Sequence, residues 1–159
     1  MKTIYILLLY IAGLILQTTL FSRLALFGAK PDLLLIIIVF IAIKKGAMAG
    51  EIYGFVGGLL EDFVTYGFLG IQALTKTLMG FGAGFLKNKL EENNIILLML
   101  LVFFTSIISG LLGNIARTFF SAYYFLAQDA LRVFLSALYT MVLTPVIVPV
   151  MKKIYSERK

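Results

Sequence analysis

Residues 95–112 read IILLMLLVFFTSIISGLL, a mostly apolar run without a charged side chain. A helix needs about 20 such residues to cross the roughly 30 Å hydrocarbon core of a bilayer, so this run is the clearest candidate transmembrane helix. Hydrophobic residues make up 61% of the 159-residue chain and charged residues only 14%, too few to cover a water-soluble globule. The sequence therefore predicts an all-α membrane protein with one polytopic domain, residues 1–159.

Further apolar stretches flank this run on both sides. The N-terminal one resembles a signal peptide in position, but it is longer than a signal core and lacks a convincing cleavage site, so we interpret it as a retained helix. Pro31 and Asp32 form a favourable helix start, and the two short stretches after them are expected to form a compact hairpin. The six expected transmembrane helices cover residues 4–21, 31–43, 47–60, 71–86, 95–112 and 131–151.

Two features of the C-terminal half modify this pattern. Pro145 and Pro149 are expected to kink or unwind the last turns of the sixth helix. Residues 113–130 are expected to form an amphipathic outer segment at the level of the lipid headgroups. Its aromatic residues are Phe119, Phe120, Tyr123, Tyr124 and Phe125.

Basic residues decide the expected orientation, because six helices place both termini on one side and lysine and arginine favour the cytoplasmic side. If the termini are cytoplasmic, that side receives Lys2, Lys44, Lys45, Lys87, Lys89, Lys152, Lys153, Arg158 and Lys159. The outer side receives only Arg23, Lys30, Arg117 and Arg132. We therefore expect a multi-pass protein of the cell membrane with both termini in the cytoplasm. The net charge of +6 is explained by these membrane-flanking residues, and no nucleic-acid partner is expected.

The chain contains neither cysteine nor histidine. Thiolate and imidazole chemistry is therefore excluded, and with it the usual zinc, haem and iron–sulfur sites and Ser-His-Asp catalysis. The acidic residues are scattered, so no nucleophile–base pair follows from their spacing. We expect no enzymatic activity, no metal and no cofactor.

Glycines recur at intervals of four in the third expected helix, at Gly46, Gly50, Gly54 and Gly58. This spacing lines them along one face and allows another backbone to approach closely. A second ladder with the same spacing comprises Gln72, Lys76, Gly80 and Gly84. Packing between helices of the same chain is the first interpretation, and docking of a partner's transmembrane helix is the alternative.

Lys76 lies within the fourth expected helix, so its charge must find a partner, reach the interface or face a polar cavity. Glu61 and Asp62 are the nearest carboxylates along the chain. A structural ion pair, a ligand-binding or ion-coupling cation and a polar anchor for a partner all remain open. The polar residues Asn114, Arg117, Gln128, Asp129 and Arg132 are expected to cap helix ends at the outer interface or to contact a partner there.

Residues 31–86 carry a resemblance to a known family. They include PDLLL at 31–35, GFVGGLLED at 54–62 and GFLGIQALTKTLMGFGAG at 67–84. In this order and spacing they resemble the bacterial rod shape-determining MreD family, and the length and the short basic tail fit as well.

The resemblance implies a non-enzymatic subunit of the rod complex that elongates the cell wall and supports peptidoglycan synthesis. It implies binding to the scaffold protein MreC and, through it, work with the MreB filament, the glycosyltransferase RodA and a penicillin-binding transpeptidase. It also implies a six-helix fold similar to the substrate-binding components of energy-coupling-factor transporters. On this basis the expected partner-binding residues are Gly50, Gly54, Gly58, Asp62, Lys76, Gly80 and Gly84.

Two other function classes remain as alternatives. A vitamin-binding transporter component would share the implied fold, and Lys76 could meet an anionic ligand; however, Ala12 and Gly13 are the only small residues of the first helix, which lacks the Ala-x-x-x-Ala docking pattern. A membrane-embedded enzyme would have to use Glu51, Glu61, Asp62, Lys76 or Asp129. Bound vitamin would favour the first alternative, and turnover of a lipid-linked substrate would favour the second.

Overall fold

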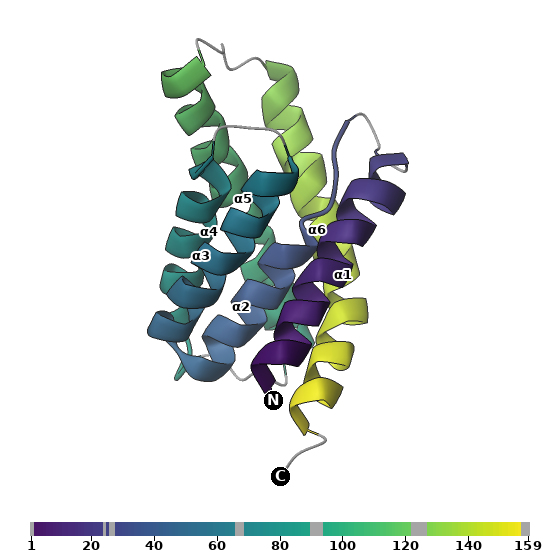
Figure 1. The fold of residues 1–159 in the computed structure, drawn as a ribbon, viewed down its shortest axis with the longest axis vertical. Helices are drawn as coiled ribbons and strands as arrows, with labels where there is room; N and C mark the ends of the chain where they lie inside the picture. The colour runs from purple at the N-terminus through teal and green to yellow at the C-terminus, as the bar shows by residue number, and fades with distance from the viewer. Residues whose placement is uncertain are drawn as a thin grey trace.

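The computed structural model describes residues 2–23, 25, 28–65, 69–89, 94–121 and 127–156. In this part the chain is all-helical, as predicted, and the helices alternate in direction to form one bundle (Figure 1). The first turn of α1 and the last turn of α6 lie at the same end of the bundle (Figure 1). The helices are α1 (Lys2–Arg23), α2 (Leu33–Lys45), α3 (Ala47–Val64), α4 (Ile71–Gly84), α5 (Ile95–Ser121) and α6 (Ala127–Ser156).

The short helix α2 is the centre of the bundle and contacts each of the five other helices. Every residue from Leu33 to Ile43 is buried. A helix that is apolar on all sides is stable only when it is surrounded on all sides, and here neighbouring helices supply that surrounding. The uniformly apolar sequence of α2 therefore follows from its position inside the protein.

The predicted hairpin of α2 and α3 is present, and a single residue, Gly46, separates the two helices. Gly46 has a φ of 104°, which glycine adopts without the steric cost that other residues meet. Its N–H donates to the carbonyl of Ala42 at 2.7 Å and so closes the end of α2. Because the turn is this tight, α3 folds back directly alongside α2.

Helices α5 and α6 are longer than the ranges expected for them. Helix α5 continues to Ser121 and α6 begins at Ala127, so much of residues 113–130 is helical rather than a separate segment. Tyr123, Tyr124 and Phe125 lie outside the described residues, as does the side chain of Phe120. Pro145 and Pro149 lie within α6, which continues to Ser156, so the expectation that they unwind its last turns is wrong, and a kink at these prolines stays a prediction.

Among the described residues, two helical segments are long and apolar enough to cross a membrane, Ile95–Phe119 and Gln128–Ile154. Only 28% and 22% of their most apolar windows are buried, whereas the core helix of a soluble protein would be mostly buried. A shorter apolar segment covers Ile6–Thr19.

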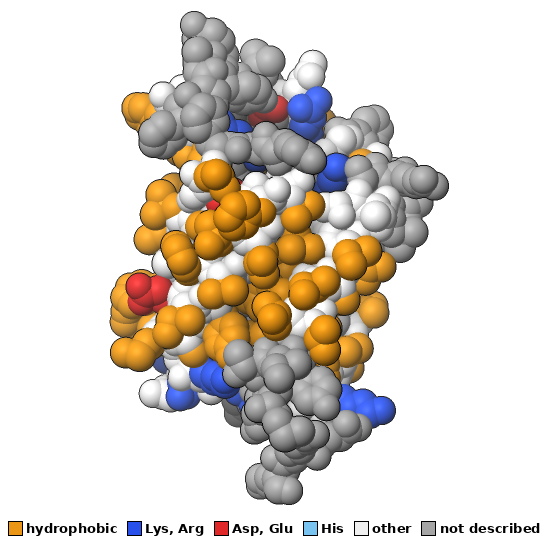
Figure 2. All heavy atoms as spheres, viewed as in Figure 1, with side chains coloured by type: hydrophobic (Ala, Val, Ile, Leu, Met, Phe, Trp, Pro, Cys, Tyr) orange, Lys and Arg blue, Asp and Glu red, His pale blue; other side chains and the backbone are white. Residues whose placement is uncertain are grey.

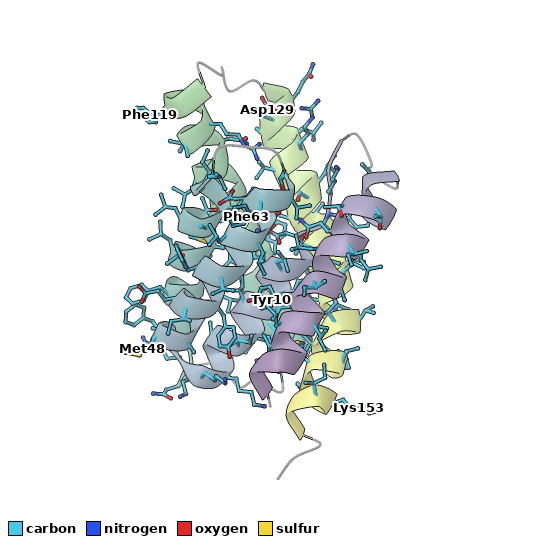
Figure 3. All side chains as sticks on the ribbon, in the orientation of Figure 1. Tyr10, Met48, Phe63, Phe119, Asp129 and Lys153 are labelled. Atoms are coloured by element: carbon cyan, nitrogen blue, oxygen red, sulfur yellow. The ribbon has the colours of Figure 1, made fainter. Side chains whose placement is uncertain are left out.

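The surface of the bundle is apolar around its middle. Figure 2 shows a band of hydrophobic side chains across one face, with basic side chains towards both ends. Met48 and Phe119 are 75% and 83% exposed and point away from the bundle (Figure 3). An apolar band between charged ends is the surface that a bilayer covers.

Candidate functional site

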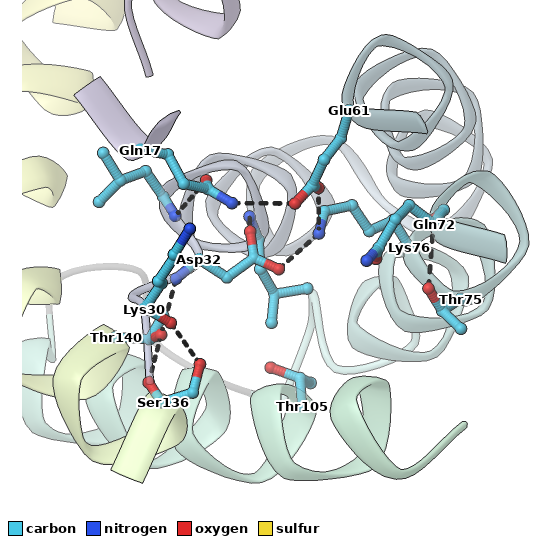
Figure 4. A network of polar contacts seen from close by, with 12 residues as sticks. Gln17, Lys30, Asp32, Glu61, Gln72, Thr75, Lys76, Thr105, Ser136 and Thr140 are labelled. Carbon is cyan, nitrogen blue, oxygen red and sulfur yellow. Dashed lines mark hydrogen bonds and ion pairs between the residues drawn. The ribbon is translucent and has the colours of Figure 1, made fainter. Parts of the chain in front are cut away.

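A buried cluster of charges lies where α2 and α4 begin and α3 ends. The Lys76 side chain is 0% exposed, and its ammonium group forms ion pairs with Asp32 and with Glu61, the latter at 2.7 Å (Figure 4). An ammonium buried in an apolar bundle is stable only with such partners. Of the roles considered for Lys76, the structural ion pair is therefore present. Asp32 is a partner that local sequence spacing did not indicate.

Two further helices fix the carboxylates of this cluster. Gln17 of α1 donates from Nε2 to Glu61 Oε1 at 2.9 Å. Asp32 caps α2 because its Oδ1 accepts the N–H of Leu35 at 2.9 Å, and its own N–H donates to Thr140 of α6 at 3.0 Å. The N-terminal end of α2 carries a partial positive charge, which favours a carboxylate at this position. The cluster thus joins α1, α2, α3, α4 and α6.

The ion-pair partners of Lys76 do not include Asp62, which instead accepts hydrogen bonds from the backbone. Its Oδ2 accepts the N–H groups of Gly70 and Ala73 at 2.9 and 3.0 Å, and its Oδ1 accepts that of Gln72 at 3.0 Å. These are N–H groups at the start of α4, which have no partner within the helix. A carboxylate at the end of α3 therefore caps α4 and sets where that helix begins.

The two predicted ladders pack against each other. Gly50 lies opposite Gly80, Gly54 opposite the backbone of Lys76, and Gly58 opposite that of Gln72. A Cβ atom at any of the three α3 glycines would collide with the backbone of α4. Gly84 likewise lies against the backbone of Ala47. Packing within the chain, the first interpretation of the ladders, is what the structure shows.

The structure thus brings the predicted partner-binding residues together along the contact between α3 and α4. The glycines at positions 50, 54 and 58, together with Asp62 and Lys76, are buried. Gly80 and Gly84 are also buried, on the facing side of α4. A role of these residues in binding a partner stays a prediction, and direct contact through the glycine faces would require α3 and α4 to separate.

A polar cavity of about 440 Å³ lies next to the charge cluster, at the end of the bundle opposite the termini (Figure 1). Asp32, Glu61 and Gln72 line it, and so do Asn114 and Arg117 from the far end of α5. Asp129 and Arg132 of α6 line it as well and are joined by an ion pair of 3.3 Å. Gln128 is exposed near the start of α6. Four of the five expected outer polar residues therefore border one cavity, which the sequence alone did not predict.

The other carboxylate considered from sequence, Glu51, is exposed on α3 and far along that helix from the cluster. No group of three or more His, Cys, Asp or Glu residues suited to a metal ion occurs among the described residues. The serines of α5 that line the cavity, Ser106 and Ser109, were not singled out from sequence. Their spacing with Asn114 and Arg117 on one helix face was the signal that could have identified them.

Residues 1–156 match the family model described as rod shape-determining protein MreD. No curated protein and no solved structure matches the chain.

Proposed function

Because the chain belongs to the rod shape-determining MreD family, we propose that it is a non-enzymatic membrane subunit of the bacterial rod complex. The observation that carries this proposal is the extent of the match, which covers residues 1–156. The subunit binds an MreC-like scaffold protein and supports peptidoglycan synthesis during elongation. Through that scaffold it works with an MreB filament, a RodA glycosyltransferase and a penicillin-binding transpeptidase.

The proposal includes six membrane crossings in one domain, with both termini cytoplasmic. The alternating helix directions and the shared end of α1 and α6 support it (Figure 1). At that end lie Lys44 and Lys45 in the last turn of α2, Lys87 and Lys89 after α4, and Lys153 in α6. The positive-inside rule places such an end in the cytoplasm. The fold of energy-coupling-factor substrate-binding components stays part of the same proposal, supported by the number of helices.

We place the docking surface for the scaffold's transmembrane helix on the exposed face of the α3–α4 pair, which points away from the rest of the bundle. The glycine ladders hold the two helices in close contact, and the caps from Asp62 and the pairs of Lys76 fix their ends. Ile52 and Phe55 of α3 are 55% and 51% exposed on the pair's outer surface. The seven predicted residues then act on partner binding by positioning this surface rather than by touching the partner.

A binding role without catalysis is supported by the tasks that the acidic residues already have. Glu61 is paired with Lys76, Asp62 caps α4, and Asp129 is paired with Arg132. Each of these contacts gives its carboxylate a structural role, which accounts for its position without a catalytic one. The same ion pairs and hydrogen bonds explain why charged side chains are present inside an apolar bundle.

Affinity purification of the tagged full-length chain from native membranes of a rod-shaped bacterium tests the proposal. We expect an MreC-like protein to co-elute, and depletion of the chain to produce rounded cells. Recovery of the chain without such a partner, together with normal cell shape after depletion, would overturn the proposed function.

Two matched double variants test the docking surface. Ile52→Ala with Phe55→Ala alters the outer side of α3, whereas Phe104→Ala with Ile108→Ala alters equally exposed positions of α5. We expect the first pair to reduce recovery of the scaffold protein and the second to leave it unchanged. Equal recovery from both would remove the docking surface from α3.

A further inference from the structure

The cavity at the end opposite the termini has the properties of a ligand site. Its volume of about 440 Å³ lies within the range of roughly 300–1,000 Å³ found for small-molecule pockets. Asp32 and Glu61 of the charge cluster line its floor, and both carboxylates are paired with the fully buried Lys76. The cluster therefore gives the cavity a polar base in which two ion pairs hold the carboxylates in place.

One face of α5 supplies the wall. Ser106, Ser109 and Asn114 are only 6%, 7% and 8% exposed, and all three line the cavity. Their side chains make no hydrogen bond within the part of the chain that the structure describes. Hydrogen-bonding groups that are nine-tenths buried are normally satisfied, so their free donors and acceptors require water or a ligand in the cavity.

Arg117 lies one further turn along the same face and also lines the cavity. Asp129 holds the neighbouring Arg132 in an ion pair of 3.3 Å. Arg117 has no ion-pair or hydrogen-bond partner among the described residues. A ligand entering here meets an unpaired guanidinium first and a row of hydroxyl and amide groups deeper in.

We propose that this cavity binds a polyol phosphate, with its phosphate on Arg117 and its hydroxyl groups on Ser106, Ser109 and Asn114. Guanidinium groups bind phosphate through charge-assisted hydrogen bonds. Hydroxyl and amide side chains both donate and accept, as the hydroxyls of a polyol do. Two sources present this chemistry: the headgroup of phosphatidylglycerol and a soluble polyol phosphate. The site is separate from the α3–α4 surface of the proposed function, so either can fail without the other.

Full-length protein in phosphatidylcholine nanodiscs tests the soluble source by calorimetric titration with glycerol 3-phosphate. The lipid source is tested by native mass spectrometry of protein released from mixed phosphatidylcholine and phosphatidylglycerol nanodiscs, which reports the lipid retained. We expect saturable binding in the first experiment or preferential retention of phosphatidylglycerol in the second. Binding in the first assigns a soluble ligand, and retention in the second alone assigns a lipid headgroup.

Three variants connect either signal to the cavity. Arg117→Gln should weaken it by about tenfold or more, since it removes a charged hydrogen-bond donor. Ser109→Ala, which removes a single hydroxyl group, should weaken it by about threefold to tenfold. Lys89→Gln removes one positive charge at the opposite end of the bundle and should have no effect. Absence of both signals, or equal signals from Arg117→Gln and Lys89→Gln, would overturn the proposal.

Discussion

Lys76 is the residue on which several helix ends depend. Its ammonium group lies between Asp32 at the start of α2 and Glu61 near the end of α3, with no exposure to solvent. Removing one member of such a buried cluster leaves the others without compensation, which typically costs about 3–5 kcal/mol. The position is therefore structural whether or not a ligand binds above it.

We predict that Lys76→Met destabilises the protein by about 3–5 kcal/mol, because the buried Glu61 carboxylate and the partly buried Asp32 carboxylate would then lie close together without a cation. Thermal unfolding in detergent measures the effect. The matched control is the same substitution combined with Asp32→Asn and Glu61→Gln, which removes the uncompensated charges and should recover part of the loss. A single variant as stable as the parent would show that the cluster is not a structural element.

Asp62 is the second residue with a structural role, since three N–H groups at the start of α4 depend on it. We predict that Asp62→Ala costs about 1–3 kcal/mol and accelerates hydrogen exchange at the first turn of α4. Glu51→Ala is the control, because Glu51 is an exposed carboxylate of the same helix and its loss should change stability by less than about 0.5 kcal/mol. Equal exchange in both variants would contradict the capping role.

At the level of elements, the contact between α3 and α4 is the most extensive of any helix pair. We predict that Gly50→Ala destabilises the protein by about 1–3 kcal/mol, because its Cβ would meet the carbonyl of Gly80. Gly82→Ala is the matched control on α4, where an added Cβ has no atom within 4 Å. It should leave stability unchanged or raise it slightly, as alanine favours the helix. Similar melting temperatures for the two variants would contradict close packing at Gly50.

The sequence predicted where the helices lie along the chain better than it predicted which residues meet between helices. The glycine spacing predicted the close face of α3, and Pro31 with Asp32 predicted the start of α2, which Asp32 caps. The ion pair of Asp32 with Lys76 could not be predicted, because it joins residues 44 positions apart whose distance depends on how α2 and α4 pack. The cavity was missed for the same reason, since it forms only where the ends of several helices meet.

For the whole molecule, orientation in the membrane is the property that links the fold to the proposed function. The cavity and the charge cluster lie at one end, and the lysines in the last turn of α2 and after α4 lie at the other. If the lysine-rich end is cytoplasmic, the cavity faces the outer side of the cell membrane. A polyol phosphate would then reach it from the outer leaflet or from the space outside the membrane.

We predict that single cysteines report this orientation directly, and the natural chain contains none that would have to be removed first. Leu69→Cys and Gln128→Cys lie at exposed positions of the cavity end, whereas Lys89→Cys and Lys153→Cys lie at exposed positions of the other end. A maleimide that cannot cross membranes should label the first pair in spheroplasts with an intact cell membrane, and all four after permeabilisation. The second pair is the control for leakage. Labelling of Lys89→Cys and Lys153→Cys alone in such spheroplasts would show that the protein has the opposite orientation. The cavity would then open towards the cytoplasm, and its ligand would have to come from there.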